Sequence, residues 1–342
     1  MKYSIIIAVY NRTEEVGELL KSAELLDADR SIFEIIFVDD GSTDGFDRFI
    51  REYESVSGLN IKTVYQENKG PGAARNRGME TASGDYFIFV DSDCIFPTRW
   101  LAEIEKSVTK NSWDAFGGPD TAHSSFPPLL KAIDYSMTSF IGTGGTRGNK
   151  KHIGKYYPRS FNMGISRKVY ETIGGMNRLR HGQDMDYSMR IYAAGFRVGL
   201  IPEAYVYHKR RTSIPKFYRQ VFNWGVARIN LSRRHPDTLR LIHLIPAFLI
   251  AGLILLICLT WAWPSFTLPL WLLAAFAFVA VCLTAFFQSF AKYRHRKTAL
   301  LSVLTLNIQV FAYGCGLLYG IWHAAINKET AGFTKNYYGT EK

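Results

Sequence analysis

The chain contains the stretch Tyr86-Phe87-Ile88-Phe89-Val90-Asp91-Ser92-Asp93, in which a run of five apolar and aromatic residues ends in two carboxylates. A short uncharged run of this kind predicts a buried strand. Two like charges this close together are costly to bury without a cation, and Mg²⁺ or Mn²⁺ accepts oxygen ligands from carboxylates and phosphates. The stretch therefore predicts a divalent-cation site with a diphosphate as the remaining ligand. The alternative is an ordinary polar turn.

The residues before this stretch alternate between predicted strands and helices. Short apolar runs at residues 2–9, 33–38 and 61–65 predict three earlier strands, and residues 13–26 carry apolar side chains at helical spacing. This alternation predicts an α/β fold with a mostly parallel, Rossmann-like sheet. Ligands of such sheets bind beyond the carboxyl ends of the strands.

Three further polar clusters follow the predicted strands. They are Tyr10-Asn11, Asp39-Asp40-Gly41-Ser42 and the glycine-rich turn Gly70-Pro71-Gly72-Ala73-Ala74-Arg75-Asn76. Together with Asp91-Ser92-Asp93, they should meet at one edge of the sheet. A guanidinium and backbone amides near a helix start suit an anion. The alternative for Asp39-Asp40-Gly41-Ser42 is a tight turn with side-chain capping.

These motifs, in this order, resemble those of family 2 glycosyltransferases, over roughly residues 2–225. The resemblance implies a GT-A fold and an inverting, metal-dependent transfer from a nucleotide-activated sugar, with UDP as the expected nucleotide and GDP or TDP as alternatives. It also implies that Asp39 contacts the base, Asp91 the ribose or sugar, and Asp93 the metal. The implied nucleotide-sugar-binding residues are Ala8, Tyr10, Asn11, Asp39, Asp40, Arg75, Asp91 and Ser92.

The second half of the chain offers a candidate catalytic base. Gln183-Asp184-Met185-Asp186 begins a predicted helix, and family members usually have Glu-Asp where this chain has Gln183-Asp184. An inverting displacement needs a carboxylate that accepts the acceptor's proton, and we assign that role to Asp184. The alternative is that Asp184 and Asp186 cap the helix and complement its dipole. Arg190 is placed to hold either acid.

His208 follows a short apolar strand and is a candidate metal ligand. Family members often have a histidine here that approaches the metal or diphosphate, and neutral imidazole suits Mn²⁺ better than Mg²⁺. A purely structural histidine is the alternative. The basic, glycine-rich segment 142–155 is expected to close over phosphates or to form a solvated insertion.

The C-terminal part has the composition of a membrane region. Residues 241–291 and 298–327 contain no Lys, Arg, Asp or Glu. Spans are predicted at about residues 241–263, 267–290 and 299–326. Asn307, Gln309 and two glycines make the third span less regular, and a re-entrant segment is its alternative. A soluble helical core is the alternative for the whole region.

Positive charge next to these segments predicts their orientation. The net charge is +11, and residues 205–240 hold nine Lys and Arg residues and one acid. This charge indicates anionic lipid headgroups rather than nucleic acid, with residues 213–240 as an amphipathic interfacial segment. Basic residues at 292–297 place the catalytic domain, residues 1–212, in the cytoplasm at the inner membrane. Three spans would put the tail, residues 328–342, on the far side. We expect no signal peptide.

One segment indicates whether the enzyme would add many sugars in succession: Gln220-Val221-Phe222-Asn223-Trp224. Processive synthases of the resembled family carry QxxRW near this point, and here Asn223 replaces the arginine. The sequence therefore favours transfer of one sugar to a membrane-held acceptor in cell-envelope or polysaccharide biosynthesis, with Gln183, Gln220 and Trp224 as acceptor or loop candidates. The alternatives are a processive synthase and a non-catalytic, sugar-nucleotide-binding partner of another enzyme.

Overall fold

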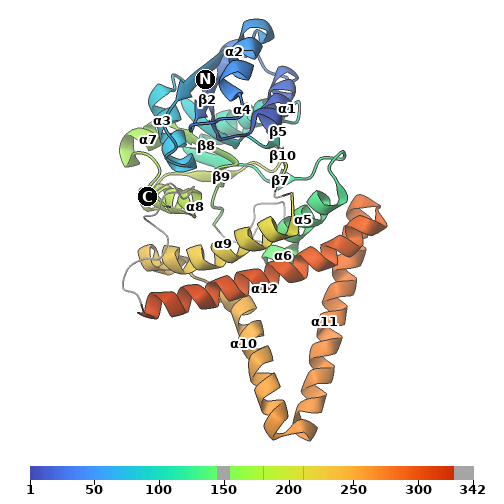
Figure 1. The fold of residues 1–342 in the computed structure, drawn as a ribbon. Coiled ribbons are helices and arrows are strands. Elements are labelled where there is room, and N and C mark those ends of the chain that lie inside the picture. The colour runs from blue at the N-terminus through green and yellow to red at the C-terminus, as the bar shows by residue number, and fades with distance from the viewer. Residues whose placement is uncertain (145–154, 180, 211, 327–342) are drawn as a thin grey trace. The chain divides into compact units, whose positions relative to one another are not determined.

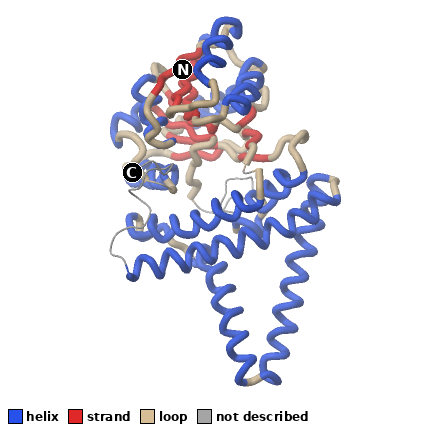
Figure 2. The backbone as a smooth tube through the Cα atoms, viewed as in Figure 1, coloured by secondary structure: helices blue, strands red, loops and turns tan. Residues whose placement is uncertain are grey.

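The computed structural model describes residues 1–144, 155–179, 181–210 and 212–326 (Figure 1). The chain divides into two compact units. The first holds the described residues of 1–121 and 146–209, and the second those of 122–145 and 210–331. Figure 2 shows the strands gathered in the first unit, whereas the second is helical. Most of the predicted basic segment 142–155 lies outside the described residues.

A seven-stranded sheet forms the centre of the first unit, in the order β3-β2-β1-β4-β8-β6-β9. Its strands β1 to β4 are parallel, β8 runs antiparallel to β4 and β6, and β9 is parallel to β6. The predicted mostly parallel α/β architecture is thus confirmed. The strands are β1 (Tyr3–Val9), β2 (Phe33–Asp39), β3 (Ile61–Tyr65), β4 (Tyr86–Asp91), β6 (Ala115–Gly117), β8 (Asn162–Ser166) and β9 (Val198–Leu200).

Both faces of this sheet are covered by helices, which explains why its central strands are continuously apolar. Along β1, Ile5 and Ile7 join one buried cluster and Ile6 joins the other. Helices α1, α2 and α4 contribute to the first cluster, and α3, α7 and α8 to the second. They are α1 (Thr13–Glu24), α2 (Phe46–Ser57), α3 (Pro71–Thr81), α4 (Trp100–Asn111), α7 (Arg167–Ile173) and α8 (Gln183–Ala193), with a 3₁₀ turn at Arg30–Ile32.

A second, three-stranded sheet has the order β5-β10-β7. It consists of β5 (Cys94–Ile95), β7 (Asp120–Thr121) and β10 (Val206–His208). In its register His208 lies opposite Cys94, and Val206 lies opposite Asp120. This small sheet brings the end of β10 next to the residues that follow β4.

The second unit contains six helices and a 3₁₀ turn at Pro236–Thr238 within its described residues. The helices are α5 (Pro128–Thr138), α6 (Phe140–Thr143), α9 (Ile214–Arg234), α10 (Leu241–Ala262), α11 (Pro264–Tyr293) and α12 (Arg296–Ile326). By length and composition α10, α11 and α12 are each able to cross a membrane, as the sequence predicted. The structure differs from the predicted boundary at residue 212 in one respect. Residues 122–145 join the second unit, because α5 and α6 pack on α12.

Candidate functional site

The first part of the site lies at the carboxyl end of β4, where the sequence placed it. Asp91 ends β4, and Asp93 follows two residues later. A guanidinium nitrogen of Arg75, on α3, lies 2.7 Å from Oδ1 of Asp91. Arg75 is 7% exposed, whereas the side chain of Asp91 is 31% exposed, so water still reaches the carboxylate of this pair. The structure therefore brings Arg75 and Asp91 together as one charged pair.

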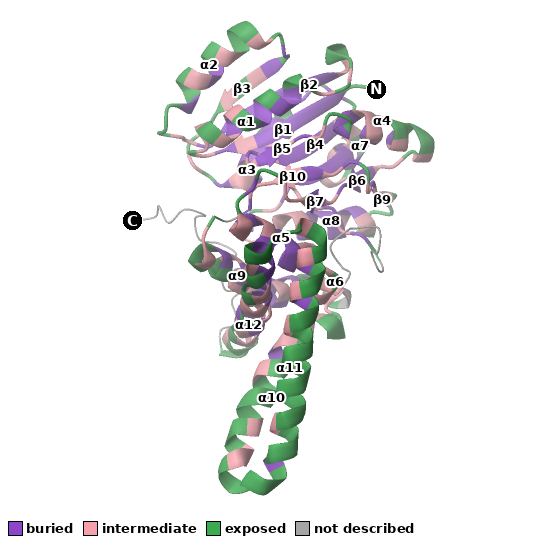
Figure 3. Cartoon of the chain, turned by 90° about the vertical axis from the view of Figure 1, so that its right-hand side faces the viewer, coloured by how far each residue is buried: buried purple, intermediate pink, exposed green. Residues whose placement is uncertain are grey.

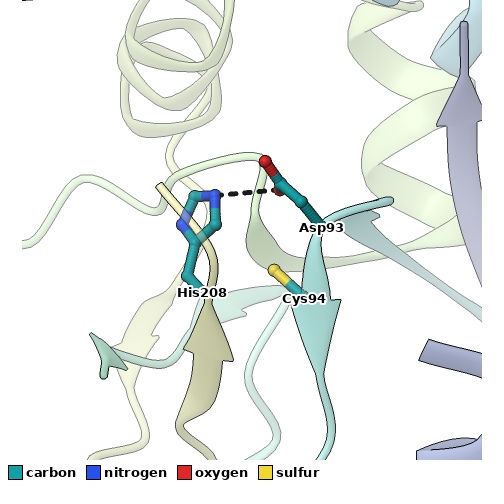
Figure 4. Close-up of side chains that lie close together, drawn as sticks. All are labelled: Asp93, Cys94 and His208. Carbon is teal, nitrogen blue, oxygen red and sulfur yellow. Dashed lines mark ion pairs between the residues drawn. The ribbon is translucent and has the colours of Figure 1, made fainter. Parts of the chain in front are cut away.

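His208 lies beside the carboxylate of Asp93 (Figure 4) and near that of Asp91. Its Nε2 is 3.1 Å from Oδ1 of Asp93 and 3.9 Å from Oδ2 of Asp91. The register of β10 against β5 holds it there. Burial would lower the pKa of His208, but the carboxylates of Asp93 and Asp120 outweigh it and raise the pKa to about 9. Two acids and an imidazole thus converge on one point in the first unit.

Cys94 lies in the same group, since a ligand atom from each of Asp93, Cys94 and His208 falls within 4.8 Å of the others (Figure 4). Burial, followed by the charges of Asp93 and Asp91, raises the pKa of the Cys94 thiol well above its usual value. The thiol also lies 3.7 Å from the carbonyl oxygen of Phe161. Thiolate ligands select soft ions, whereas carboxylate and imidazole suit an ion such as Mn²⁺. The donors that fit such a cation are therefore the carboxylate of Asp93 and the imidazole of His208.

Asp120 supports His208 from the other side, and the sequence reasoning missed it. Its Oδ2 lies 3.2 Å from Nδ1 of His208, and the residue is 3% exposed. Asp120 lies on β7, directly after Gly118-Pro119, and nothing in its local sequence distinguishes it from a loop aspartate. Asp120 can be identified only from the folded structure, because β7 pairs with the strand that ends in His208.

The ends of β1 and β2 form a polar loop pair beside β4. Strand pairing places Val9 opposite Asp39 and Ala8 opposite Asp91. Asn11 has a left-handed backbone (φ 51°), and its side-chain oxygen accepts a hydrogen bond from the amide of Thr43. Six predicted nucleotide-binding residues thus lie at or just beyond the carboxyl ends of three neighbouring strands: Ala8, Tyr10, Asn11, Asp39, Asp91 and Ser92.

Asp39 and Asp40 are used differently, although they are adjacent. Oδ1 of Asp39 accepts a hydrogen bond from the amide of Ser42, as in the alternative capped turn. Asp40 is 1% exposed and accepts hydrogen bonds from Gln66 and from the amides of Lys69 and Gly70. Burial raises the pKa of Asp40 despite these bonds. Asp40 therefore holds the turn that starts α3, and its direct contact with a donor remains a prediction.

The start of α8 lies against the start of α3. A Cβ atom added at Gly72 would come within 2.3 Å of the side-chain nitrogen of Gln183, so these two residues are in direct contact. Gly72 precedes Arg75 by one helical turn, and Arg75 reaches Asp91. This contact brings the predicted base segment to the glycine-rich turn.

The two acids of α8 have separate environments. Asp186 is 1% exposed, accepts a hydrogen bond from Asn177 and pairs with Arg190 at 3.3 Å. Arg190 therefore holds Asp186. The side chain of Asp184 is 21% exposed, accepts a hydrogen bond from the amide of Met185 and lies 3.8 Å from Arg159. Of these acids, Asp184 is the one that solvent reaches.

The remaining candidates lie in the second unit. Gln220 and Trp224 are on α9, four residues apart and therefore on one face of that helix. Trp224 packs against a cluster that contains Ile133, Phe217 and Val221. Their assignment to an acceptor remains a prediction.

Two sequence profiles match the chain. Residues 4–174 match Glycosyl transferase family 2, and residues 161–290 match Glycosyl transferase family group 2. The chain is 26% identical over 239 residues to Glycosyltransferase AglE of Haloferax volcanii, which covers 67% of this chain and 76% of that protein. It is 40% identical over 156 residues to the poly(ribitol-phosphate) beta-glucosyltransferase of Bacillus spizizenii, covering 42% of this chain and 24% of that protein. The chain thus spans most of the first relative but about a quarter of the second.

A solved structure is similar in fold. It is the mannosyltransferase PcManGT from Pyrobaculum calidifontis, in complex with GDP-Man and Mn²⁺. The TM-score is 0.56 at 19% sequence identity, and the similarity covers 94% of this chain and 87% of that one. At this identity the likeness concerns the fold. The sequence matches confirm the family resemblance drawn from the motifs.

Proposed function

We propose, from the premise that this chain belongs to glycosyl transferase family 2, that it transfers one sugar from a nucleoside diphosphate sugar to a membrane-held acceptor, with inversion at the anomeric carbon. The observation that carries the proposal is the convergence of Asp91, Asp93 and His208 at the end of β4. These groups lie beside the loops of β1 and β2, where the donor nucleotide is expected. A glycosyltransferase is the class to which the matched relatives belong.

Asp93 and His208 are the residues that would hold a divalent cation, with Asp91 beside them. Their oxygen and nitrogen donors fit Mn²⁺, the ion present in the similar mannosyltransferase. Such a cation, when bound, stabilises the negative charge of a departing diphosphate. Arg75 neutralises part of the charge of Asp91, which lets two acids share a site that also receives phosphates. We expect UDP as the nucleotide, with GDP or TDP as alternatives.

Asp184 is the proposed base. In an inverting displacement the acceptor hydroxyl attacks from the side opposite the leaving nucleotide, and a carboxylate takes its proton. Asp186 is engaged with Asn177 and Arg190, whereas Asp184 is exposed at the first turn of α8. The contact of Gln183 with Gly72 supports a position for this turn close to the donor loops.

A membrane-held acceptor is proposed from the second unit. α10 and α11 are long apolar helices, and only 6% of the residues in the most apolar stretch of each are buried, which suits a lipid environment. Basic residues border them at Arg240 and at 292–297, so we place the first unit in the cytoplasm at the inner membrane. Lipid-linked saccharides and glycolipids of cell-envelope biosynthesis are acceptors that such an anchored enzyme meets at the membrane surface.

Thermal unfolding of the intact chain in detergent tests the donor site. Each of UDP, GDP and TDP is added with Mn²⁺, Mg²⁺ or EDTA, to the unaltered chain, to Asp93→Ala and to the control Asp47→Ala. We expect one nucleotide to raise Tm in the presence of metal, in the unaltered chain and the control but not in Asp93→Ala. A folded protein that responds to none of them would contradict the proposal. Metal-dependent binding without turnover in any lipid extract would instead favour the non-catalytic partner.

A further inference from the structure

The three apolar helices differ in how much of each is buried. In the most apolar stretch of α10 and of α11, 6% of the residues are buried, against 44% for α12. Figure 3 shows α10 and α11 exposed along most of their length. A helix in lipid needs no protein partners, whereas α12 has them over much of its length. Although the three helices have similar compositions, α10 and α11 are exposed whereas α12 is packed against other protein elements.

α10 and α11 form a hairpin that contacts α12 near the start of α10 and near the end of α11. At the start of α10, Pro246 and Ile250 approach Gly314. Near the end of α11, the hydroxyl of Ser289 lies 2.7 Å from that of Ser302. Towards the tip, Trp271 donates a hydrogen bond to Thr260 and so joins the two helices to each other.

Between these two contacts, the rest of the hairpin does not pack on α12. Most large apolar side chains from Leu253 to Val281 are exposed. Figure 1 shows α10 and α11 departing from α12 and converging at their far ends. On α12 these contacts extend from Ser302 to Gly314, about 12 residues or about 18 Å along the helix axis. α12 therefore runs across the base of the hairpin instead of alongside its two helices.

One face of α12 is occupied by α5 and α6. Thr305 donates a hydrogen bond to the carbonyl oxygen of Ala132, and Gln309 donates to those of Ser136 and Gly142. These bonds give partners on α5 and α6 to the side-chain nitrogen of Gln309, one of the polar residues that made the third predicted span less regular. The side-chain nitrogen of Asn307 donates to the carbonyl oxygen of Val303 in its own helix and lies 3.7 Å from the sulfur of Cys282 on α11.

The same face continues along α9. A Cβ atom at Gly316 would lie 2.0 Å from the carbonyl oxygen of Phe222, and one at Gly320 would lie 3.2 Å from Ile229. The two helices thus lie side by side over at least two turns, as Figure 1 also shows. Whatever orientation α12 has in a membrane, α9 shares it.

α9 cannot cross a bilayer at acceptable cost. It carries five basic residues, Lys216, Arg219, Arg228, Arg233 and Arg234. A Lys or Arg at the centre of a bilayer costs about 2.5–3.5 kcal/mol even on the lower scales. At the surface the same residues face anionic headgroups, which attract them.

We propose that α12 lies along the membrane surface beside α9, and that the α10–α11 hairpin alone crosses the bilayer among these three helices. The outer face of α12 contacts the headgroup and upper acyl region of the cytoplasmic leaflet. That face is opposite the one that packs on α5 and α9, and it carries exposed Leu300, Leu304, Phe311 and Trp322. Aromatic and aliphatic side chains of this kind suit the interface. Two crossings then return Ile326 to the side on which α9 lies.

Single cysteines at the two ends of α12 test this arrangement in the full chain. Cys258, Cys282 and Cys315 are replaced by alanine, and buried Cys94 is kept. Into this background Lys297→Cys, Ala325→Cys and Ser265→Cys are introduced one at a time, all three positions being exposed. A membrane-impermeant maleimide is then applied to spheroplasts and to inverted membrane vesicles. The background without an added cysteine gives the blank.

We expect Lys297→Cys and Ala325→Cys to be labelled in inverted vesicles, and Ser265→Cys, at the hairpin tip, in spheroplasts. Labelling of Ala325→Cys from the spheroplast side, or from neither side, would overturn the proposal, because a spanning α12 puts its ends on opposite sides. Failure of Ser265→Cys to label from the spheroplast side would overturn the crossing of the hairpin itself. None of these outcomes depends on sugar transfer, so they test the topology independently of the proposed function.

Discussion

His208 and Asp120 form a hydrogen-bonded pair, in which Nδ1 of the imidazole lies 3.2 Å from Oδ2 of the buried carboxylate. A carboxylate at this position accepts the Nδ1 proton and leaves Nε2 directed at Asp93, 3.1 Å away. Carboxylate–histidine pairs of this type fix the ring orientation and tautomer of metal-binding histidines. Asp120 is therefore a positioning residue for the proposed cation site.

The first prediction concerns this pair. Asp120→Asn keeps the size of the side chain but removes its charge, so His208 is oriented less firmly. We expect the metal concentration for half-maximal activation to rise by about 10–100-fold, the range that outer-shell changes typically produce. Activity at saturating metal should largely recover. The measurement is a Mn²⁺ titration of sugar transfer by the solubilised chain.

Asp93→Asn is the control for this titration. It alters a proposed ligand itself, so saturating metal should not restore its activity. An Asp120→Asn chain whose activity and metal requirement are both unchanged would contradict the positioning role. A chain that instead loses thermal stability without a change in metal requirement would show that Asp120 is structural.

The second prediction separates the two acids of α8. Asp184→Asn removes the proposed base, and we expect turnover to fall by about 10²–10⁴-fold, the usual contribution of general acid–base catalysis. The metal-dependent rise in Tm with nucleotide should persist, since the donor site is untouched.

Asp186→Asn provides the comparison. Its carboxylate is 1% exposed and bonded to Asn177 and Arg190, so its replacement should lower Tm and reduce activity mainly through stability. If Asp184→Asn retained turnover, the assignment of the base would be wrong.

Parts of the site were predictable because they depend on local sequence and strand direction. A run such as Tyr86–Asp91 predicts its own strand, and parallel strands place their carboxyl ends at one edge. Asp91 and the loop of Asp39 could thus be grouped from the amino-acid sequence alone. Asp120 could not, because it reaches His208 through the pairing of β7 with a strand 86 residues later, between Asp120 and Val206.

In the membrane region, too, local properties were predictable from the sequence and long-range contacts were not. Length and composition identified three helices correctly, because apolar runs are a local property. They could not reveal that Thr305 and Gln309 have partners on α5 and α6, more than 160 residues earlier. Burial against distant elements is what distinguishes α12 from α10 and α11.

The third prediction concerns the contact of Gly72 with Gln183. Gly72→Ala would place a Cβ atom 2.3 Å from the amide nitrogen of Gln183, so this side chain must move or the start of α3 must shift. The atoms met are the far end of a flexible side chain, so the cost should lie near the lower end of the about 1–3 kcal/mol that overpacking typically costs. We expect a lower Tm and weaker nucleotide binding.

The double variant Gly72→Ala/Gln183→Ala is the matched test, because it removes the atoms that the new methyl group would meet. Tm should recover towards that of Gln183→Ala alone. Equal losses in the single and double variants would show that Gly72 is required for another reason, such as close approach of a phosphate.

The fourth prediction concerns stability in acid. Glu34 is 4% exposed and accepts hydrogen bonds from Ser4 and Ser83, while its other oxygen lies 2.7 Å from the ammonium of Lys62. Burial would raise the pKa of Glu34, but Lys62 and these hydrogen bonds lower it from 4.5 to about 2. The folded state therefore favours the charged carboxylate, whose contribution is complete above the usual pKa and is lost as the pH falls towards the folded value.

Glu34→Gln should accordingly lower Tm at neutral pH, because the amide cannot replace the charge opposite Lys62. The difference in Tm between the two chains should shrink as the pH falls below about 4.5, where protonation begins to remove the same charge from the unaltered chain. Measuring both chains in the same detergent and buffers cancels the titration of the other carboxylates, which the two chains share. A difference that stayed constant from neutral pH down to about pH 3 would mean that Glu34 acts through its shape and hydrogen bonds and not through its charge.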